Sequence, residues 1–252
     1  MEQTARWGVA AVVGCAAMMG ATAWAQGEAP PFDLSGRWAM VQDQVTVATV
    51  PVVGEVRSTT RAVILFDLAQ RQERLQGQGT LCALDVDSGS AMVDTVLPPA
   101  FLKVQPRPTM DARLKRDGER WRLKQRRTLH VAGAKLEDPR ADALPTSPDD
   151  PRVLDEDKDG HPGVTVWVRG LLDGDIYLTT RSWSDFEGLV QDPKRISGST
   201  RFGQEQVILG TTSRFLDDPP EAKPDLNQSR FWLLRLDDAA TCEDAKRAAD
   251  DL

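Results

Sequence analysis

The chain has 252 residues, of which 40% are hydrophobic and 27% charged, and its formal net charge is −7 at pH 7. This length fits one large all-β domain or two small domains, and the moderate acidity disfavours a surface that binds nucleic acid. After Ala25 the sequence has no apolar span of about 20 residues, so it predicts no membrane-crossing helix beyond that point.

Residues 1–25 have the composition of a secretory signal peptide. A short segment containing Arg6 precedes an apolar run over residues 7–24, and Ala23-Trp24-Ala25 is a small-x-small cleavage motif. The sequence therefore predicts an exported protein, periplasmic or secreted, in which residues 26–252 form a single domain. Two alternatives stay open: a retained membrane helix, and a lipid anchor on Cys15, because Val12-Val13-Gly14-Cys15 resembles the lipobox of bacterial lipoproteins.

Strand patterns dominate the rest of the chain. Alternating, β-branched runs are separated by Gly, Pro and Asp at short intervals, and Asp117-Gly118 and Asp173-Gly174 are typical of hairpin turns. A short helix is predicted over residues 237–252, with Thr241 or Asp238 as its N-cap. These patterns predict an all-β fold: an antiparallel, up-and-down barrel of about ten strands, or a large sandwich. The predicted strands are residues 36–47, 61–68, 73–86, 101–105, 111–116, 121–131, 164–169, 175–183, 198–211 and 230–236.

Alternation along residues 121–131 indicates which side chains face the core. The positions of Trp121, Leu123, Leu129 and Val131 form a mainly apolar side. The opposite side, which we expect to be wet, holds Arg122, Lys124, Arg126, Thr128 and His130.

The first strand after the leader begins with Gly36-Arg37-Trp38. This triplet resembles the Gly-x-Trp signature that opens lipocalins and related calycin barrels. The resemblance implies that Trp38 packs across the closed end of the barrel against Arg235 of the last strand. It also implies a cavity that binds a small apolar ligand. The alternative is an ordinary core tryptophan beside a turn.

Removal of residues 1–25 leaves two cysteines, Cys82 and Cys242. In an exported chain two distant cysteines indicate one disulfide, with two unpaired buried thiols as the alternative.

An acidic loop provides the one spacing that implies specific chemistry. Asp155, Asp157 and Asp159 alternate and are followed by Gly160, which is similar to the Asp-x-Asp-x-Asp-Gly class of extracellular calcium loops on scaffolds other than the EF-hand. The backbone carbonyl of His161 is a further candidate ligand. The pattern predicts a structural calcium site that fastens the Pro-rich, exposed segment 136–152 to the strand that follows. A solvated acidic turn is the alternative.

The sequence has few candidate catalytic residues, and we expect that the protein is not an enzyme. Asp185 and Glu187 leave a hydrolase as a third hypothesis. The first is a monomeric, calcium-stabilised barrel that binds a lipid-like small molecule or an envelope component. The second is a structural or interaction protein of the cell envelope with a filled barrel.

Overall fold

The computed structural model describes residues 29–50, 54–90 and 92–252, so the predicted signal peptide and Cys15 lie outside the described residues. The strands are β1 (Gly36–Val50), β2 (Gly54–Arg71), β3 (Arg74–Asp87), β4 (Val93–Val96), β5 (Thr109–Asp117), β6 (Arg120–Gln125), β7 (Thr128–Ala132), β8 (Val164–Gly170), β9 (Gly174–Asp192), β10 (Arg195–Thr211), β11 (Lys223–Pro224) and β12 (Arg230–Arg235). The helices are α1 (Pro99–Val104), the single 3-10 turn η1 (Arg214–Leu216) and α2 (Cys242–Asp250).

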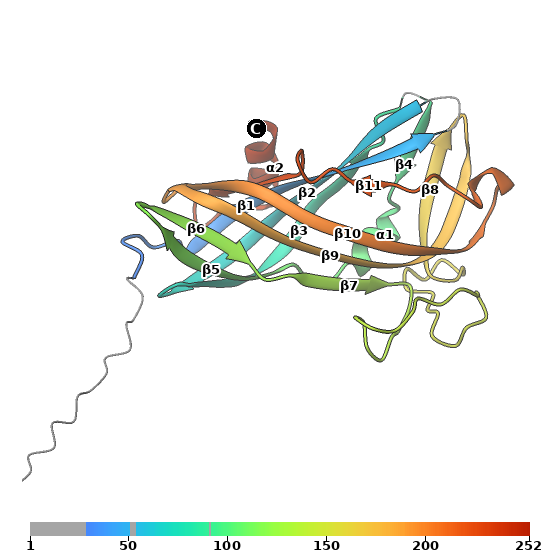
Figure 1. Ribbon diagram of the computed structural model, residues 1–252, viewed down its shortest axis with the longest axis horizontal. Helices are drawn as coiled ribbons and strands as arrows, with labels where there is room; N and C mark the ends of the chain where they lie inside the picture. The colour runs from blue at the N-terminus through green and yellow to red at the C-terminus, as the bar shows by residue number, and fades with distance from the viewer. Residues whose placement is uncertain (1–28, 51–53, 91) are drawn as a thin grey trace, which may run out of the picture.

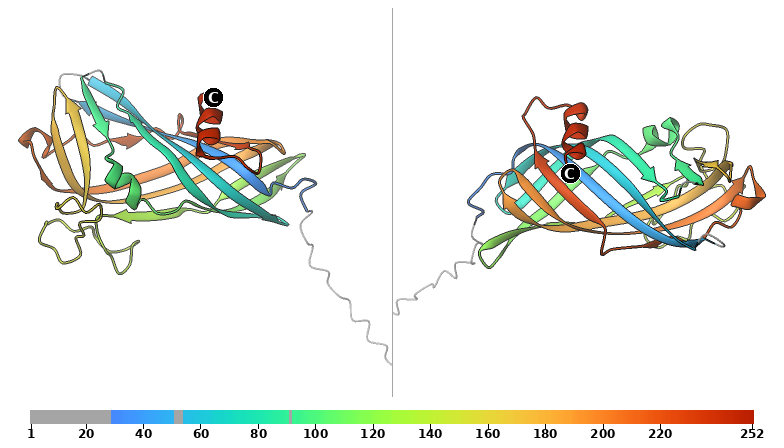
Figure 2. Two further views of the ribbon diagram at one scale, coloured as in Figure 1. Left: turned by 180° about the vertical axis from the view of Figure 1, so that it is seen from behind. Right: turned by 90° about the horizontal axis from the view of Figure 1, so that it is seen from above.

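The strands form one large antiparallel sheet. Its order is β10-β12-β1-β2-β3-β5-β6-β9-β8-β4, with β11 beside β1, β7 beside β9, and a further pairing between β10 and β9. The sheet is long and strongly curved, and α2 stands on its outer surface (Figures 1 and 2). The predicted all-β chain with a short C-terminal helix is confirmed. The sheet does not form a clearly closed barrel, since β5 pairs with β3 only over Arg74–Gln78.

Several boundaries differ from the prediction. Of the predicted strand 101–105, residues 101–104 are helical instead of extended, because Pro98 and Pro99 precede them and proline fixes a backbone angle that suits the first helical turn. The predicted strand 121–131 is divided into β6 and β7, and the short strands β4 and β11 were not predicted. The hairpin turn at Gly118 and the N-cap at Thr241 are confirmed.

One end of the curved sheet is packed with side chains. Trp38, Phe231 and Leu75 are fully buried there, and the segment before β1 covers them through Leu34. Trp38 donates its indole N–H to the carbonyl of Leu34 at 2.9 Å. The hydrophobic core therefore lies on the concave side of the sheet, near the start of β1.

A second apolar cluster lies on the convex side, beneath α2. Ala245 and Ala249 of the helix pack against Val41 and Val63 of the sheet. A disulfide joins Cys242, at the start of α2, to Cys82 of β3. The predicted pairing is confirmed. In the register between β2 and β3, Val63 opposite Ala83 is followed by Ile64 opposite Leu81, so Cys82 is an extra residue in a β-bulge at this point.

Among the described residues, no helix combines the length and the apolar character that a membrane span requires.

Candidate functional site

Three adjoining cavities follow the concave side of the sheet away from the packed end. The inner cavity, of about 240 Å³, lies beside Met40 and Phe186. The middle cavity, also of about 240 Å³, lies beside Gln44 and His130. The outer chamber, of about 350 Å³, lies beside Phe101 and Ile176. The inner and middle cavities share Pro106, Pro108, Thr128, His130 and Ser184 as lining, and the middle cavity and outer chamber share Leu84, Gln105 and Gln204.

The side chain of His130 faces this interior because the register against β9 shifts by one residue between β6 and β7. Leu123 of β6 pairs with Gly188. Thr128 lies five residues after Leu123, but its partner Ser184 lies only four residues before Gly188 on β9. Since side chains alternate between the two faces of a strand, the extra residue turns those that follow to the other face. The prediction that Thr128 and His130 share one side of the sheet with Arg122 is therefore wrong, although Thr128 is exposed as expected.

The middle cavity has a mixed lining, with more polar groups than the outer chamber. Gln44, Gln105, Gln204 and Ser182 contribute amide and hydroxyl groups to its lining. The Nε2 atom of His130 is buried, and it has no hydrogen-bond partner among the described residues. Burial lowers the pKa of this imidazole below its ordinary value, and the charge of Glu156 opposes the shift only in part. The ring is neutral and belongs to the lining of the inner and middle cavities, while its Nε2 atom is buried beneath their surface.

The outer chamber is mainly apolar. Its walls come from β2, β3, β4, β8, β9 and β10, and α1 with the turn before it contributes Leu97 and Phe101. On β8, Val166 and Val168 point into the chamber, whereas Thr165 points to the other face. The apolar lining includes Leu84, Val86, Leu97, Phe101, Val166, Val168, Ile176, Leu178 and Ile208.

The acidic loop folds as a compact turn on the convex side of β8. One carboxylate oxygen of each of Asp155, Asp157 and Asp159 lies within 4.8 Å of those of the other two. Asp155 accepts hydrogen bonds from the backbone N–H groups of Asp159 and Gly160, at 3.1 and 3.0 Å. Thr165 of β8 donates its backbone N–H to Asp157 and its hydroxyl to Asp159. The structure therefore brings together the three aspartates that the sequence predicted.

Asp157 is the buried member of this cluster. Its side chain belongs to a residue that is only 8% exposed, and its Oδ1 atom is buried without a hydrogen-bond partner among the described residues. Burial, and then the neighbouring charges of Asp159 and Asp155, raise the pKa of this carboxyl, although the hydrogen bond from Thr165 acts in the opposite direction. A buried carboxylate oxygen without a partner is destabilising unless a cation or a proton neutralises it.

The imidazole of His161 lies outside the carboxylate cluster. It stacks on the ring of Tyr177, with the ring centroids 4.1 Å apart and the planes 10° apart. Its Nε2 atom lies 3.3 Å from the Tyr177 hydroxyl. This stack and Gly163 hold the loop against β9. Gly163 has a φ of +91°, and a Cβ at this position would lie 2.3 Å from the carbonyl oxygen of Leu178. The role of the His161 carbonyl as a ligand stays a prediction.

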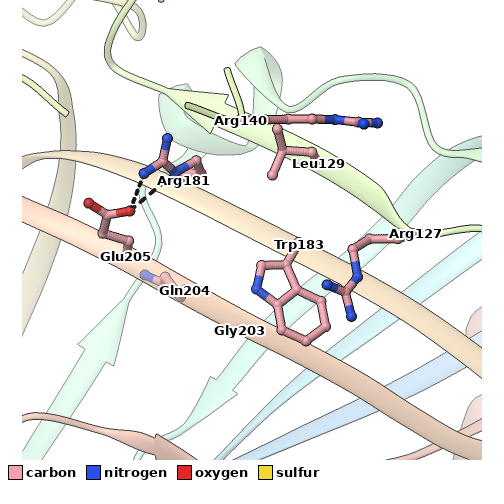
Figure 3. A pocket seen from close by; sticks show the side chains of 8 residues that line it. All are labelled: Arg127, Leu129, Arg140, Arg181, Trp183, Gly203, Gln204 and Glu205. Atoms are coloured by element: carbon pink, nitrogen blue, oxygen red, sulfur yellow. Dashed lines mark hydrogen bonds and ion pairs between the residues drawn. The ribbon is translucent and has the colours of Figure 1, made fainter. Parts of the chain in front are cut away.

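A hollow of about 600 Å³ lies on the convex side of β9 and β10, around Trp183 (Figure 3). The guanidinium of Arg127 stacks 3.7 Å from the centroid of the Trp183 ring. Arg181 pairs with Glu205 and donates hydrogen bonds to the carbonyls of Pro139 and Asp142. These contacts fasten the irregular segment 136–152 to the sheet. Of the three arginines that line the hollow, Arg127 and Arg181 are therefore held by contacts with other residues of the protein.

Asp185 and Glu187, the pair considered for hydrolysis, are both held by ion pairs. Asp185, whose side chain is 6% exposed, accepts hydrogen bonds from Arg127 at 3.1 Å and Arg201 at 2.7 Å. Glu187 lies 3.4 Å from Arg122 and 3.8 Å from Lys124. Both carboxylates thus have structural partners.

Comparison with models of protein families, with curated proteins and with solved structures gives no match to this chain. The candidate sites therefore depend on geometry alone. Sequence reasoning found the three aspartates through their spacing, but it missed the residues of the cavities. The break at Arg126-Arg127, where charged residues interrupt the alternation, is the signal that would have placed His130 inside.

Proposed function

We propose that this protein is an exported, lipocalin-like barrel that binds a lipid-like small molecule in its interior and is stabilised by calcium. The barrel is packed at the end where Trp38 lies and hollow toward the other end. Support for closure comes from β10, which pairs with β12 on one side and with β9 on the other, so that the strand order returns to its start.

The observation that carries the binding function is the outer chamber. A space of about 350 Å³ with a mainly hydrocarbon lining falls within the size range of small-molecule sites. The chamber adjoins the middle cavity and is partly open to water, so a ligand with an apolar chain would bury hydrocarbon surface that is otherwise hydrated.

Two matched variants test this site. Ile208 of β10 lines the chamber, whereas its neighbour Val207 is absent from the lining and faces the other side of the strand. We expect the Ile208→Trp variant to lose binding of an apolar fluorescent probe such as N-phenylnaphthylamine, because the indole fills the chamber. The Val207→Trp variant should bind the probe as the parent does. Equal binding by both variants would refute an interior site.

Calcium is proposed at Asp155, Asp157 and Asp159. The observation behind it is the buried Oδ1 atom of Asp157, which lacks a partner in the described residues and lies in a cluster of hard oxygen donors that repel one another. The cation would fasten the loop to β8. The test is thermal melting of the mature protein in calcium, in magnesium and in chelator. A melting temperature that does not rise with calcium would refute the site.

The second candidate function is a structural or interaction protein of the cell envelope with a filled interior. The packed cluster around Trp38 and Phe231 favours it. This candidate predicts that no apolar probe binds the parent protein at all.

A further inference from the structure

We infer that the ligand is an uncharged amphiphile, whose hydroxyl-bearing end lies beside His130 in the middle cavity and whose alkyl chain lies in the outer chamber. This inference rests on the proposed binding function and specifies the chemical class of the ligand.

The first argument is the change in polarity along the interior. The middle cavity offers the amides of Gln44, Gln105 and Gln204, and the hydroxyl groups of Ser182 and Ser184. The adjoining outer chamber offers mainly hydrocarbon. A molecule with a polar end and an apolar chain can form hydrogen bonds in the middle cavity and bury its chain in the outer chamber, whereas a wholly apolar molecule can do only the second.

The second argument is the lack of charge. No Asp, Glu, Lys or Arg of the described residues lines the middle cavity or the outer chamber. The inner cavity has Arg107, which is exposed and lies 3.5 Å from the side-chain oxygen of Gln78. A carboxylate or ammonium group beside His130 would lose part of its hydration without meeting a charged side chain in the lining of the middle cavity or the outer chamber. The site thus selects against fatty acids and cationic amphiphiles.

The third argument is the state of His130. Its buried Nε2 atom lacks a hydrogen-bond partner in the described part of the chain, although a polar atom in such a place usually has one. A neutral imidazole presents either a donor or an acceptor at Nε2, depending on its tautomer. A hydroxyl group both donates and accepts, so it would satisfy either form once the imidazole turns enough to expose Nε2 to the cavity.

Decyl compounds that differ only in the polar end test the head-group preference. Decanol, decanoic acid, decyltrimethylammonium and decane would compete with bound N-phenylnaphthylamine at about pH 8, where a carboxylic acid is ionised. We expect decanol to displace the probe at least about tenfold more effectively than decanoate or the ammonium compound. The free energy needed to bury one uncompensated charge exceeds about 1.4 kcal/mol, which corresponds to a tenfold change in affinity. Decanol should also exceed decane.

Variants of His130 test its part in that preference. The His130→Leu variant removes the hydrogen bond, so we expect decanol to bind about five- to tenfold more weakly, while decane binds within about twofold of its parent affinity. The His130→Gln variant keeps a neutral hydrogen-bonding group and should retain most of the affinity for decanol. Should either variant fail to fold, the head-group comparison on the parent protein decides the question alone.

The outcomes separate this inference from the proposed function. If the probe binds the parent and Ile208→Trp abolishes binding, but decanoate competes as well as decanol, the binding function stands and the inference on ligand class is wrong. The same holds if decanol shows no advantage over decane. If the probe does not bind the parent, the proposed function itself fails.

Discussion

The guanidinium of Arg235 lies over the ring of Trp38, 5.7 Å from its centroid, and the two residues face each other in the register between β1 and β12. Arg235 also donates hydrogen bonds to the carbonyls of Asp33 and Ser35. A Cβ on Gly36, whose φ is +125°, would lie 3.2 Å from the Arg235 guanidinium. This explains why glycine opens the Gly36-Arg37-Trp38 triplet. The contact implied by the lipocalin resemblance is present, whereas kinship with that family remains a proposal.

Arg235→Ala should lower the free energy of unfolding by about 2 kcal/mol, because two charge-assisted hydrogen bonds and a cation–π contact are lost together. Arg235→Lys should recover only part of this, since an ammonium group cannot reproduce the planar fork. Urea unfolding measures both effects. Arg230→Ala, on the same strand, is the control, because Arg230 is exposed and, within the described ranges, its side chain donates a hydrogen bond only to the carbonyl of the adjacent Ser229. Equal losses at the two positions would contradict this prediction.

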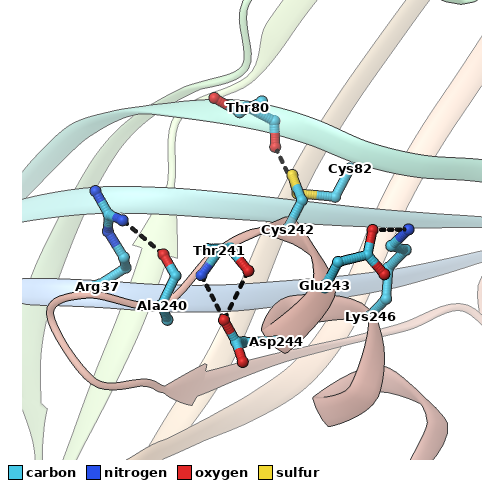
Figure 4. The surroundings of a disulfide bond; sticks show 9 residues. All are labelled: Arg37, Thr80, Cys82, Ala240, Thr241, Cys242, Glu243, Asp244 and Lys246. Carbon is cyan, nitrogen blue, oxygen red and sulfur yellow. Dashed lines mark hydrogen bonds and ion pairs between the residues drawn. A yellow bond between two sulfur atoms is a disulfide. The ribbon is translucent and has the colours of Figure 1, made fainter.

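Reduction of the disulfide should destabilise the protein strongly (Figure 4). The bond joins residues 160 apart, for which the chain-entropy model gives about 5 kcal/mol. It also holds the first turn of α2, where Asp244 accepts hydrogen bonds from the backbone and the hydroxyl of Thr241. We expect a large fall in the urea midpoint with reductant. The Cys82→Ser, Cys242→Ser double variant should show the same low midpoint and no response to reductant.

Asp157→Asn should affect stability in opposite directions with and without calcium. In chelator the change removes a buried charge that no cation balances and should stabilise the protein by about 1 kcal/mol or more. In excess calcium it removes a ligand, so the gain in melting temperature seen with the parent should largely disappear. Asp149→Asn, at an exposed position of the neighbouring loop, serves as the matched control and should leave both melting temperatures unchanged. Parent-like behaviour of Asp157→Asn in both conditions would rule out calcium at this loop.

His130 should make stability depend on pH. Its folded-state pKa is lowered by burial, so the unfolded chain binds more protons than the folded one once the pH falls toward the unfolded value of about 6.5. Stability therefore falls as the pH drops below about 6.5, and this contribution levels off below the folded-state pKa. In His130→Gln that part of the slope should vanish. Urea midpoints between about pH 5 and about pH 7.5 give the comparison, and an unchanged slope would show that the imidazole is hydrated.

Asp185→Asn should cost about 2 to 3 kcal/mol of stability, because a buried carboxylate that bridges Arg127 and Arg201 loses its charge. The half-exposed arginines keep this below the loss for a fully buried pair. Glu187→Gln, two residues away on the same face, should cost less than about 1 kcal/mol because its partners are solvent-screened. If the two variants are equally stable, Asp185 has no such structural role.

Local patterns in the sequence were sufficient for much of the fold. The disulfide followed from the count of cysteines, and the N-cap at Thr241 followed from its side chain. The three aspartates came together because the first and the last are only four positions apart in the chain, so that no long-range information was needed. The helix α1 was misread because Phe101-Leu102-Lys103-Val104 suits a strand, and the preceding prolines outweighed that propensity.

The interior could not be predicted in the same way. Whether His130 faces water or a cavity depends on one inserted residue between β6 and β7, and on which residue of β9 lies opposite. Register between distant strands is a property of the assembled sheet. The residues that line the outer chamber are spread along the chain between Thr60 and Pro219, so no local sequence pattern predicts it.

The two proposed sites, the outer chamber and the aspartate turn, lie on opposite faces of strand β8. Val166 and Val168 form part of the chamber wall. The preceding residue, Thr165, donates its backbone N–H to Asp157 of the aspartate turn. A cation that makes β8 more rigid reduces the conformational entropy that the protein loses when the amphiphile binds on the opposite face. The same holds when the amphiphile binds first. Thermodynamic linkage then requires reciprocity: the factor by which the cation tightens the amphiphile equals the factor by which the amphiphile tightens the cation.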